Sequence, residues 1–434
     1  MGGEPMLELL IIADDFTGAL DTGVQFAGGG AETRVVTDRN YDYRAAEAGI
    51  QVLVMDAETR HLPAKEAYDV VYGIAIRGIA SGIPYIYKKT DSALRGNIGS
   101  ELTALLAASG KNILPFFPAY PKIGRTTEAG YHYINGIPVK ESVFGQDPYD
   151  PVECSYIPEL IQRQSSVHVR TIRWNEAIGG TQVAPEIVVL DAQEDEQLEK
   201  LGKQLLDMGG LSVMAGCAGF AAVLPGLLKL KGVPPVPEGF SGKFLVISGS
   251  LNPITIRQLS YAQQNGFLRL SLTPEQKLET GYWSAEKGST VLNEWKNRIR
   301  GSTCCIIDST DPPGDGKTAN YAGVLGLTAK EVRERVAKSL GCVLEGLISG
   351  GEPFSLLITG GDTLLACMER LAVVEMEPVR EVGPGIVLSR FQYQGIWCQV
   401  ISKSGGFGAE TLLNDLAGQI LGNRHTAQCC VCSR

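Results

Sequence analysis

The stretch that decides the fold of this chain reads Leu9-Leu10-Ile11-Ile12-Ala13-Asp14-Asp15-Phe16-Thr17-Gly18-Ala19. Its continuous apolar run is typical of a strand that is buried on both faces of a parallel sheet. The run stops at two carboxylates, and the residues after them predict a turn and a helix that begins near Thr17. Because ligands bind at the carboxyl ends of strands in open α/β sheets, Asp14 and Asp15 are the first candidate binding residues.

Two readings of this acidic pair stand side by side. Ionised carboxylates only accept hydrogen bonds, so the pair favours a ligand that is rich in hydroxyls or carries a cation. The alternative is that an Asp caps the helix by accepting hydrogen bonds from its first backbone N–H groups. We expect the cap for one of the two residues and not for both.

Further apolar runs alternate with helical patterns along the chain. Strands are predicted over residues 7–12, 33–37, 51–55, 85–89, 112–117, 187–191 and 212–215, and helices over 64–79, 99–108 and 194–208. A stretch rich in proline and glycine, residues 232–242, then reads as a linker. A second series has strands over 244–247, 268–272, 303–308, 355–358 and 398–401, and a helix over 328–348 that opens with a capping box of Thr328 and Glu331. The pattern predicts two α/β domains with largely parallel sheets and a ligand cleft between them.

Composition narrows the function classes. Hydrophobic residues make up 44% and charged residues 20% of the chain, as in ordinary globular proteins. The balance of 39 basic against 48 acidic residues gives a net charge of −9, which argues against nucleic acid or an anionic membrane as partner. No apolar run approaches the roughly 20 residues of a transmembrane helix. The N-terminal residues include Glu4 and Glu8 and lack the basic segment with which a secretory signal begins. We expect a cytoplasmic protein.

The last residues carry a Cys429-x-x-Cys432 pair. A zinc site needs four ligands at paired spacings, and no second pair accompanies this one. We therefore expect residues 424–434 to form a disordered tail.

Polar clusters follow three more strands of the first domain. Lys88-Lys89-Thr90-Asp91-Ser92-Ala93-Leu94-Arg95 would gather cations, a carboxylate and hydroxyls, which suits a ligand that bears both a carboxylate and hydroxyls. A salt-bridge cluster at a helix N-terminus explains this segment equally well. Arg60 follows another strand, and Lys122 to Thr127 follow a fourth. Four polar strand ends in one domain favour a common pocket.

Glycine turns end the strands of the second domain. They comprise Ser248-Gly249-Ser250, Thr359-Gly360-Gly361-Asp362-Thr363 and Lys403-Ser404-Gly405-Gly406-Phe407-Gly408. Glycine lets the backbone approach a ligand, and the N–H groups of a helix N-terminus favour phosphate, so three such turns indicate a nucleotide site. Gly316-Lys317-Thr318 resembles the end of a P-loop, but Asp311 stands where the first glycine belongs. We expect an exposed loop there.

Together these motifs resemble the four-carbon acid sugar kinase family. The resemblance rests on residues 13–19, 89–97, 117–126, 359–363 and 403–408, in that order along nearly the whole chain. It implies an enzyme that uses ATP to phosphorylate the terminal hydroxyl of threonate, erythronate or 3-oxo-tetronate. It further implies a sugar-acid domain over residues 1–231 and a nucleotide-binding domain over 243–423, joined by the linker.

The resemblance also implies site residues. Asp14, Arg60 and the segment from Lys89 to Ser92 resemble the sugar-acid contacts, with Asp15 and Arg95 beside them. The residues that resemble the ATP contacts are Ser248, Gly360, Gly361, Asp362, Thr363 and Gly405. Phe16 and Ala93 depart from the more usual Leu and hydroxyl residue of the family, and Ala93 bears on which acid fits.

The mechanism expected is direct phosphoryl transfer, in which the protein supplies positioning and charge stabilisation. Arg60 or Lys89 would hold the substrate carboxylate, and Asp14 and Asp91 its hydroxyls. One of these two acids would accept the proton, and Asp91 is favoured because nearby cations would keep it ionised. Mg²⁺ would bind chiefly through phosphates and waters, so no protein metal ligand is assigned. Closure of the cleft would exclude water.

Two alternatives remain from the residues themselves. One is a kinase for another small hydroxy acid or sugar. The other is a non-catalytic sensor that binds sugar acids, against which the three glycine turns count. A dinucleotide-dependent oxidoreductase is weaker, since no GxGxxG follows the first strand of either domain. The expected partners are a small-molecule sugar acid and ATP, and the sequence leaves open whether the chain forms a homo-oligomer.

Overall fold

The apolar runs become strands of parallel sheets in the computed structural model, which describes residues 7–45, 49–147, 150–179, 185–236, 240, 242–312, 314–349 and 354–422. The chain divides into two compact units, Met1–Pro235 and Val236–Arg434. The division falls inside the stretch predicted as a linker. The predicted tail, residues 424–434, lies outside the described residues.

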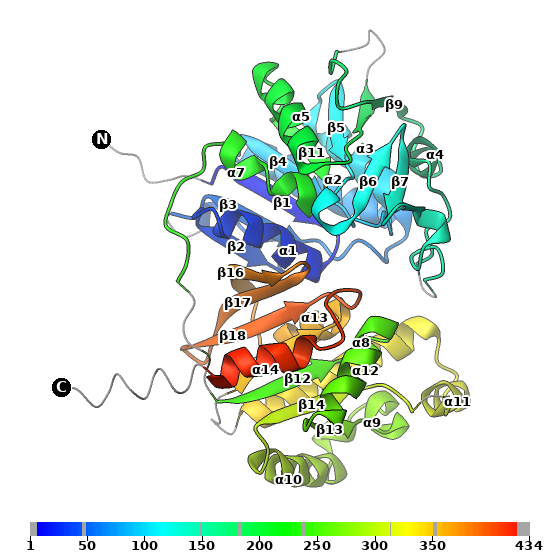
Figure 1. Ribbon diagram of the computed structural model, residues 1–434, viewed down its shortest axis with the longest axis vertical. Coiled ribbons are helices and arrows are strands. Elements are labelled where there is room, and N and C mark those ends of the chain that lie inside the picture. The colour runs from blue at the N-terminus through cyan, green and yellow to red at the C-terminus, as the bar shows by residue number, and fades with distance from the viewer. Residues whose placement is uncertain are drawn as a thin grey trace, which may run out of the picture. The chain divides into compact units, whose positions relative to one another are not determined.

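The first unit contains a sheet whose strands all run parallel to their neighbours. Its order is β2-β3-β1-β4-β11-β5-β10-β9 (Figure 1). The strands are β1 (Leu9–Ala13), β2 (Thr33–Val36), β3 (Val52–Asp56), β4 (Tyr85–Lys89), β5 (Ile113–Phe117), β9 (His168–Ile172), β10 (Glu186–Leu190) and β11 (Val213–Gly216). Every residue of β1, β3 and β10 is buried, as expected where helices cover both faces. Strand β9 was not predicted.

Helices cover both faces of this sheet. They are α1 (Phe16–Ala27), α2 (Ala64–Ala80), α3 (Ile98–Ser109), α4 (Ile157–Gln162), α5 (Asp195–Asp207), α6 (Ala218–Ala221) and α7 (Leu224–Leu227). Helices α2 and α3 pack on one face, where Val71, Ile74, Leu102 and Leu105 join Leu10 and Ile12 in a single core cluster. Helix α1 packs against β1, β2 and β3 and also contacts α6.

A separate three-stranded antiparallel sheet, in the order β6-β7-β8, follows β5. It consists of β6 (Arg125–Glu128), β7 (Tyr131–Ile134) and β8 (Ile137–Pro138). None of these strands was predicted, because buried polar residues such as Thr127 and His132 interrupt any apolar alternation.

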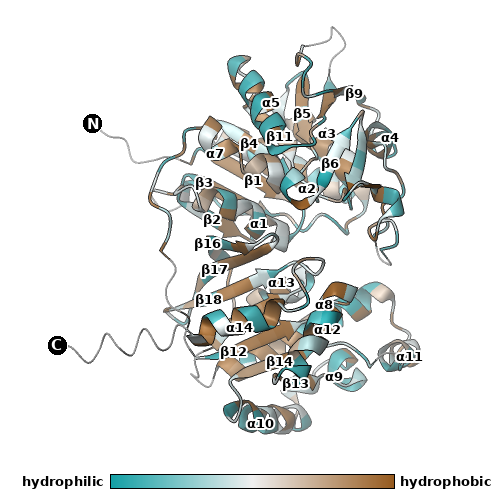
Figure 2. Ribbon diagram, in the orientation of Figure 1, coloured by the Kyte–Doolittle hydropathy of each residue, from teal (hydrophilic) through white to brown (hydrophobic). Residues whose placement is uncertain are grey.

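The second unit contains a mixed sheet in the order β13-β14-β12-β15-β18-β17-β16. Its strands are β12 (Lys243–Ser248), β13 (Leu268–Ser271), β14 (Cys304–Asp308), β15 (Phe354–Thr359), β16 (Glu375–Gly383), β17 (Ile386–Tyr393) and β18 (Ile396–Lys403). The pairs from β13 to β18 are parallel, and β18 continues into the antiparallel hairpin of β17 and β16. Figure 2 shows hydrophobic colour along β12 and β14 and hydrophilic colour on the helix α10.

The helices of this unit are α8 (Pro253–Gln264), α9 (Pro274–Leu278), α10 (Glu286–Arg300), α11 (Lys317–Val324), α12 (Ala329–Ile348), α13 (Gly361–Arg370) and α14 (Leu412–Gly422). The capping box of Thr328 and Glu331 is confirmed at the start of α12. Pro253 occupies the first position of α8, whose cap Asn252 accepts from the Ile254 backbone N–H. Among the described residues, no helix is both long and apolar enough to cross a membrane.

The exposed loop expected around Gly316 is wrong, because helix α11 starts at Lys317. The carboxylate of Asp311 accepts hydrogen bonds from both the backbone N–H and the hydroxyl of Thr318 at 2.8 and 2.6 Å. Lys277 Nζ, which is buried, lies 2.5 Å from the same carboxylate. Asp311, seven residues before Thr318, therefore caps the first turn of α11.

Candidate functional site

The first unit brings its polar strand ends together at β1. This strand lies between β3 and β4, so the chain runs from β1 to one side of the sheet and returns to the other. Ligands bind at such a reversal in open α/β sheets. Ala13 is in register with both Asp56 and Lys89, so the three strands end level with one another. The residues that follow them therefore share one place.

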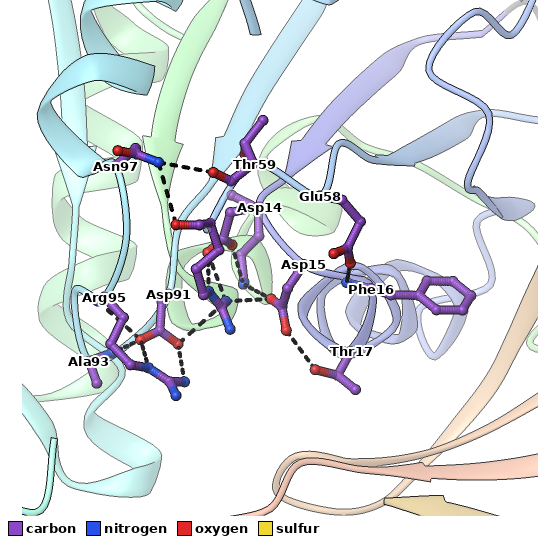
Figure 3. A network of polar contacts seen from close by, with 12 residues as sticks. Asp14, Asp15, Phe16, Thr17, Glu58, Thr59, Asp91, Ala93, Arg95 and Asn97 are labelled. Carbon is purple, nitrogen blue, oxygen red and sulfur yellow. Dashed lines mark hydrogen bonds and ion pairs between the residues drawn. The ribbon is translucent and has the colours of Figure 1, made fainter. Parts of the chain in front are cut away.

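Arg60 lies at the centre of the resulting network. Its Nε is 2.8 Å from Asp14 Oδ2, and its Nη2 is 2.7 Å from the same oxygen and 2.5 Å from Asp15 Oδ1. Nη2 is also 3.7 Å from Asp91 Oδ1. Figure 3 shows Asp14, Asp15 and Asp91 turned toward this common space. One guanidinium thus contacts three carboxylates from two strand ends.

The loop that carries Arg60 is fixed by backbone contacts. The Arg60 N–H donates to the Asp14 carbonyl at 3.2 Å. Asn97 Nδ2 donates to the carbonyl of Thr59 at 2.9 Å (Figure 3) and to that of Leu62 at 2.8 Å, which ties the loop to the start of α3. Asn97 was quoted only as part of a motif, and its side chain now has a positioning role.

Lys89 supplies a second cation. Its Nζ lies 3.6 Å from Asp14 Oδ1 and 4.0 Å from Asp15 Oδ1. Burial alone would raise the pKa of Asp15, but the charges of Arg60 and Lys89 outweigh it and lower the pKa to about 2. Asp14 Oδ1 is buried and accepts no hydrogen bond from the described part of the chain. It is therefore available to a ligand hydroxyl.

Lys88, the neighbour of Lys89, does not join this network. Successive residues of a strand point to opposite faces, and Lys88 Nζ lies 2.8 Å from Glu101 Oε2 in the interior. Both side chains are almost fully buried. The expectation that both lysines lie in one place is therefore wrong for Lys88, which is a structural residue.

Asp91 is held by its own segment. Arg95 contacts it twice, with Nε 2.8 Å from Oδ2 and Nη2 3.0 Å from Oδ1. The backbone N–H groups of Ala93 and Arg95 donate to Oδ2 as well. Burial opposes ionisation, but Arg95 and Arg60 lower the pKa of Asp91 well below its usual range. The protein itself thus occupies most acceptor positions of this carboxylate.

Thr90 and Ser92 complete the predicted segment. Thr90 is fully buried, its backbone N–H donates to the Gly216 carbonyl at 2.8 Å, and its hydroxyl has no hydrogen-bond partner among the described residues. The Ser92 carbonyl lies 2.9 Å from His132 Nε2, which connects the segment to β7. The Thr90 hydroxyl is therefore a second candidate contact for a ligand.

The expected helix cap is not present at α1. Asp15 occupies the N-cap position with extended backbone, but its side chain accepts no hydrogen bond from a helix N–H. Its carboxylate instead accepts from the Thr17 hydroxyl at 2.6 Å and from Arg60. Glu58 accepts from the Phe16 N–H at 3.2 Å (Figure 3). At Asp15 the ion pair with Arg60 thus takes the place of the expected helix cap.

In the second unit, three strand ends lie in a row. Ser248 of β12 is in register with Thr359 of β15, which is in register with Lys403 of β18. The hydroxyls of Ser248 and Thr359 are buried and have no hydrogen-bond partner within the described residues. The order of strands reverses at β12, so this row also lies at a reversal point of its sheet.

The glycines of this row lie where a side chain would collide with neighbouring groups. A Cβ on Gly249 would lie 2.1 Å from Thr363 Oγ1, and a Cβ on Gly405 would lie 2.6 Å from Ser250 Oγ. Gly360 has φ +104°, a conformation that other residues rarely adopt, and it leads directly into Gly361 and α13. The turns thus form a close-packed backbone cradle at the N-terminus of a helix, which suits a phosphate group.

Asp362 differs from its neighbours in the motif. Its carboxylate lies 3.3 Å from Arg333 Nε of α12, and 40% of its side chain is exposed. It therefore lies on the rim of the cradle, while Thr363 is buried inside it.

Lys403 is a buried cation that was quoted in the motif but not assigned to the site. Its Nζ lies 3.2 Å from Thr255 Oγ1 and donates to the carbonyls of Ser404 and Gly405 at 3.1 and 3.3 Å. No carboxylate of the described residues lies within ion-pair distance of it, and burial lowers its pKa to about 7. Lys403 thus anchors the Gly405 turn through hydrogen bonds, and no carboxylate of the described residues balances its charge.

The pH dependence of stability tests this arrangement. The pKa of Lys403 is about 7 in the folded protein, against 10.5 in the unfolded chain. The unfolded state therefore binds the extra proton between these values, and stability rises with pH. From pH 7 to pH 10 we expect the free energy of unfolding of the wild type to rise, relative to Lys403→Met, by up to about 4 kcal/mol.

Urea denaturation followed by tryptophan fluorescence measures this change, since Trp283, Trp295 and Trp397 belong to the second unit. The control is Lys243→Met. Its Nζ donates to the carbonyls of Ile299 and Arg300 at the opposite end of β12, and this variant should follow the wild type. A difference between wild type and Lys403→Met that stays constant with pH would contradict the assignment.

Family models match both units. A model described as a sugar-binding N-terminal domain matches residues 9–224. A second model, described as a nucleotide-binding C-terminal domain, matches residues 245–413. The polar network belongs to the first match and the glycine cradle to the second.

Several curated proteins are similar to this chain over most of its length. D-threonate kinase of Salmonella typhimurium is 30% identical and aligns with 94% of this chain and 97% of its own. D-erythronate kinase of Heliobacterium modesticaldum is 28% identical, with coverage of 87% and 89%. 3-Oxo-tetronate kinase of Salmonella typhimurium is 25% identical, with coverage of 94% and 97%.

Two solved structures share the fold. One, from Salmonella typhimurium LT2, has a TM-score of 0.77 at 24% identity and covers 95% of this chain and 99% of its own. The other, Haemophilus influenzae protein HI1011, has a TM-score of 0.67 at 20% identity, with coverage of 95% and 100%. These likenesses confirm the α/β architecture.

Proposed function

Since this chain belongs to the four-carbon acid sugar kinase family, we propose that it transfers a phosphoryl group from ATP to the terminal hydroxyl of a four-carbon sugar acid. D-Threonate, D-erythronate and 3-oxo-tetronate are the acids that the names of its relatives supply. One observation carries the proposal: a sugar-binding and a nucleotide-binding domain occur together in one chain that aligns almost end to end with such kinases.

The acceptor hydroxyls bind at the network of the first unit in this proposal. Asp14 Oδ1 and the Thr90 hydroxyl are buried groups without a hydrogen-bond partner among the described residues, so a polyol supplies what they lack. Arg60 and Lys89 keep the nearby carboxylates ionised. Their positive charge is balanced by those same carboxylates, so they orient Asp14 and Asp15.

Asp14 is the better proton acceptor of the two predicted acids. Both Asp91 oxygens face Arg95, and one also accepts two backbone N–H groups, which makes that carboxylate a weak base. Asp14 has one oxygen bound by Arg60 and the other facing Lys89 at 3.6 Å. We assign Asp14 to the reacting hydroxyl and Asp91 to holding Arg95.

The phosphoryl donor binds at the cradle of the second unit in this proposal. The unsatisfied hydroxyls of Ser248 and Thr359 and the closely packed backbone turn at Gly405 suit phosphate oxygens. Gly360, Gly361 and Thr363 line the same turn, with Asp362 at its rim. Lys403 holds the Gly405 turn in place and adds positive charge beneath it.

Mg²⁺ would enter with the nucleotide and neutralise phosphate charge. Among the described residues, no group of three or more His, Cys, Asp or Glu side chains could hold a metal ion. Mg²⁺ keeps its waters readily and is bound mainly through substrate phosphates and one or two carboxylates. The hydroxyl and backbone N–H groups of the cradle are compatible with a Mg²⁺ ion that is bound to the phosphates.

A coupled ADP-release assay tests the proposal with ATP and Mg²⁺ against D-threonate, L-threonate, D-erythronate, L-erythronate and 3-oxo-tetronate. We expect one acid to raise ADP release well above the rate without acceptor. If ATP binds in calorimetry and no acid gives turnover, the acceptor is another small hydroxy acid or sugar. If ATP does not bind at all, the kinase proposal fails and the sugar-acid sensor becomes the leading alternative.

A further inference from the structure

The positive charges of the polar network are already matched by acids. Arg60 and Lys89 share Asp14 and Asp15, and Arg95 faces Asp91. Each of these cations has at least one carboxylate oxygen within 4.0 Å. A substrate carboxylate that bound to any of them would have to compete with an acid of the protein, which leaves the substrate anion without an evident counter-charge in this set.

Arg125, the first residue of β6, is a buried guanidinium in a different situation. Only 7% of its surface is exposed. Within the described part of the chain, no carboxylate lies at ion-pair distance from it, and its Nε is buried without a hydrogen-bond partner. An isolated buried charge is expensive, so such groups normally have a partner ion. Burial is the largest influence and lowers the pKa of Arg125, with the charge of Arg95 adding to it, while the charge of Asp91 offsets the shift only in part.

A shared aromatic ring connects Arg125 with the network. Its guanidinium carbon lies 5.1 Å from the centre of the Phe144 ring, and the guanidinium carbon of Arg95 lies 5.3 Å from the same centre. Arg95 in turn contacts Asp91. Arg95 is balanced by Asp91 and Asp147, so the uncompensated positive charge beside this ring is that of Arg125, which an anion would relieve.

The backbone holds Arg125 at this place. Its N–H and carbonyl exchange hydrogen bonds with Tyr120 at 3.1 and 2.7 Å. On the paired strand β7, His132 lies between the Thr127 hydroxyl at 3.1 Å and the Ser92 carbonyl at 2.9 Å. The hairpin is thereby fastened to the segment that carries Asp91, so Arg125 is pre-positioned beside the proposed acceptor site.

We propose that Arg125 binds the carboxylate of the sugar acid and thereby makes the enzyme select an acid over a neutral polyol. The inference rests on the proposed function and names the residue that reads the acidic end of its substrate. A guanidinium offers two parallel N–H donors, which match the two oxygens of a carboxylate. Asp14 then faces the hydroxyls of the same molecule.

Calorimetric titration of D-threonate without nucleotide tests this assignment. Wild type, Arg125→Lys, Arg125→Met and the control Lys65→Met are compared, where Lys65 is an exposed cation of α2 that pairs with Asp69. We expect the Kd to rise about 10- to 100-fold in Arg125→Met, because a charged hydrogen bond is lost. The Kd of Arg125→Lys should lie between these two values, since lysine keeps the positive charge but lacks the two parallel N–H donors. Lys65→Met should bind D-threonate as the wild type does.

Turnover separates a carboxylate contact from a phosphate contact. In Arg125→Met the ratio of kcat/KM for D-threonate over threitol, which has CH₂OH in place of the carboxylate, should fall by a similar factor, with the KM for ATP unchanged. A raised KM for ATP together with unchanged D-threonate binding would overturn the proposal in favour of a phosphate contact. Should Arg125→Met fail to fold, Arg125→Lys decides by the same two readouts.

The proposed substrate and the proposed role of Arg125 can be tested separately. If none of D-threonate, D-erythronate and 3-oxo-tetronate binds the wild type, the proposed substrate class fails, and the role of Arg125 fails with it. If the wild type binds D-threonate and Arg125→Met binds it equally well, only the assignment of Arg125 is overturned.

Discussion

Replacing Asp14 by Asn should lower kcat about 10²- to 10⁴-fold, the range expected when a general base is removed. Asp14 Oδ1 is a buried carboxylate oxygen without a hydrogen-bond partner in the described part of the chain, and Lys89 Nζ lies 3.6 Å from it. Asn keeps the shape of the side chain and loses its charge and its basic oxygen. Coupled ADP release measures the loss, and calorimetry with ATP should show unchanged nucleotide affinity.

The matched comparison for Asp14 is Asp91→Asn. Asp91 is assigned to holding Arg95, so its loss should raise the KM for the acid more than it lowers kcat. If Asp91→Asn abolishes kcat while Asp14→Asn leaves it within tenfold of wild type, the two roles are reversed and the expectation from the sequence holds.

Replacing Arg60 by Met should destabilise the first unit by about 3–5 kcal/mol at pH 7. The guanidinium is 10% exposed and contacts Asp14 and Asp15 directly, with Asp91 at 3.7 Å. Its removal leaves several buried carboxylates with Lys89 as the remaining nearby cation. The control Lys65→Met breaks an exposed pair with Asp69, for which a change of about 0–1 kcal/mol is expected.

The pH dependence of this difference has a defined sign. Asp15 has a folded pKa of about 2 against 3.8 in the unfolded chain, so its contribution is present above pH 4 and is lost as the pH falls toward 2. Arg60 provides much of that depression, so the gap between wild type and Arg60→Met should narrow by about 2 kcal/mol over this range. Urea unfolding followed by circular dichroism measures the gap, and a gap independent of pH would count against the network.

The strands that carry the site could be predicted because they are continuous apolar runs that stop abruptly. Tyr85–Lys89 has the predicted bounds, and β1, β12 and β15 differ by two residues or fewer at either end. The glycine turns could be recognised for a similar reason, since each follows such a run. Local pattern is sufficient wherever a strand is covered on both faces.

The missing elements depend on contacts between distant residues. The hairpin of β16 and β17 contains Arg380 and Glu381, so no apolar run marks it. Helix α11 starts where Asp311 accepts a hydrogen bond from the Thr318 N–H, and no sequence pattern within the helix predicts that start.

Pairing within the site could not be predicted either. The sequence predicts Arg60 or Lys89 as the residue that holds the substrate carboxylate, places Arg95 beside the same site, and gives Arg125 no role of its own. Only their positions show that Arg60 faces Asp14 and Asp15, that Arg95 faces Asp91, and that Arg125 faces a ring and no acid of the described chain. We therefore propose Arg125, in place of Arg60 or Lys89, as the residue that binds the substrate carboxylate.

Phosphorus NMR of the product formed from ATP, Mg²⁺ and D-threonate tests the central claim most directly. Transfer to the terminal hydroxyl places phosphorus next to a CH₂ group, so the account predicts a new phosphomonoester signal that two equivalent or nearly equivalent protons split into a triplet. A doublet would place the phosphoryl group on an inner hydroxyl. A signal of inorganic phosphate alone, with no ester from D-threonate, D-erythronate or 3-oxo-tetronate, would contradict the account.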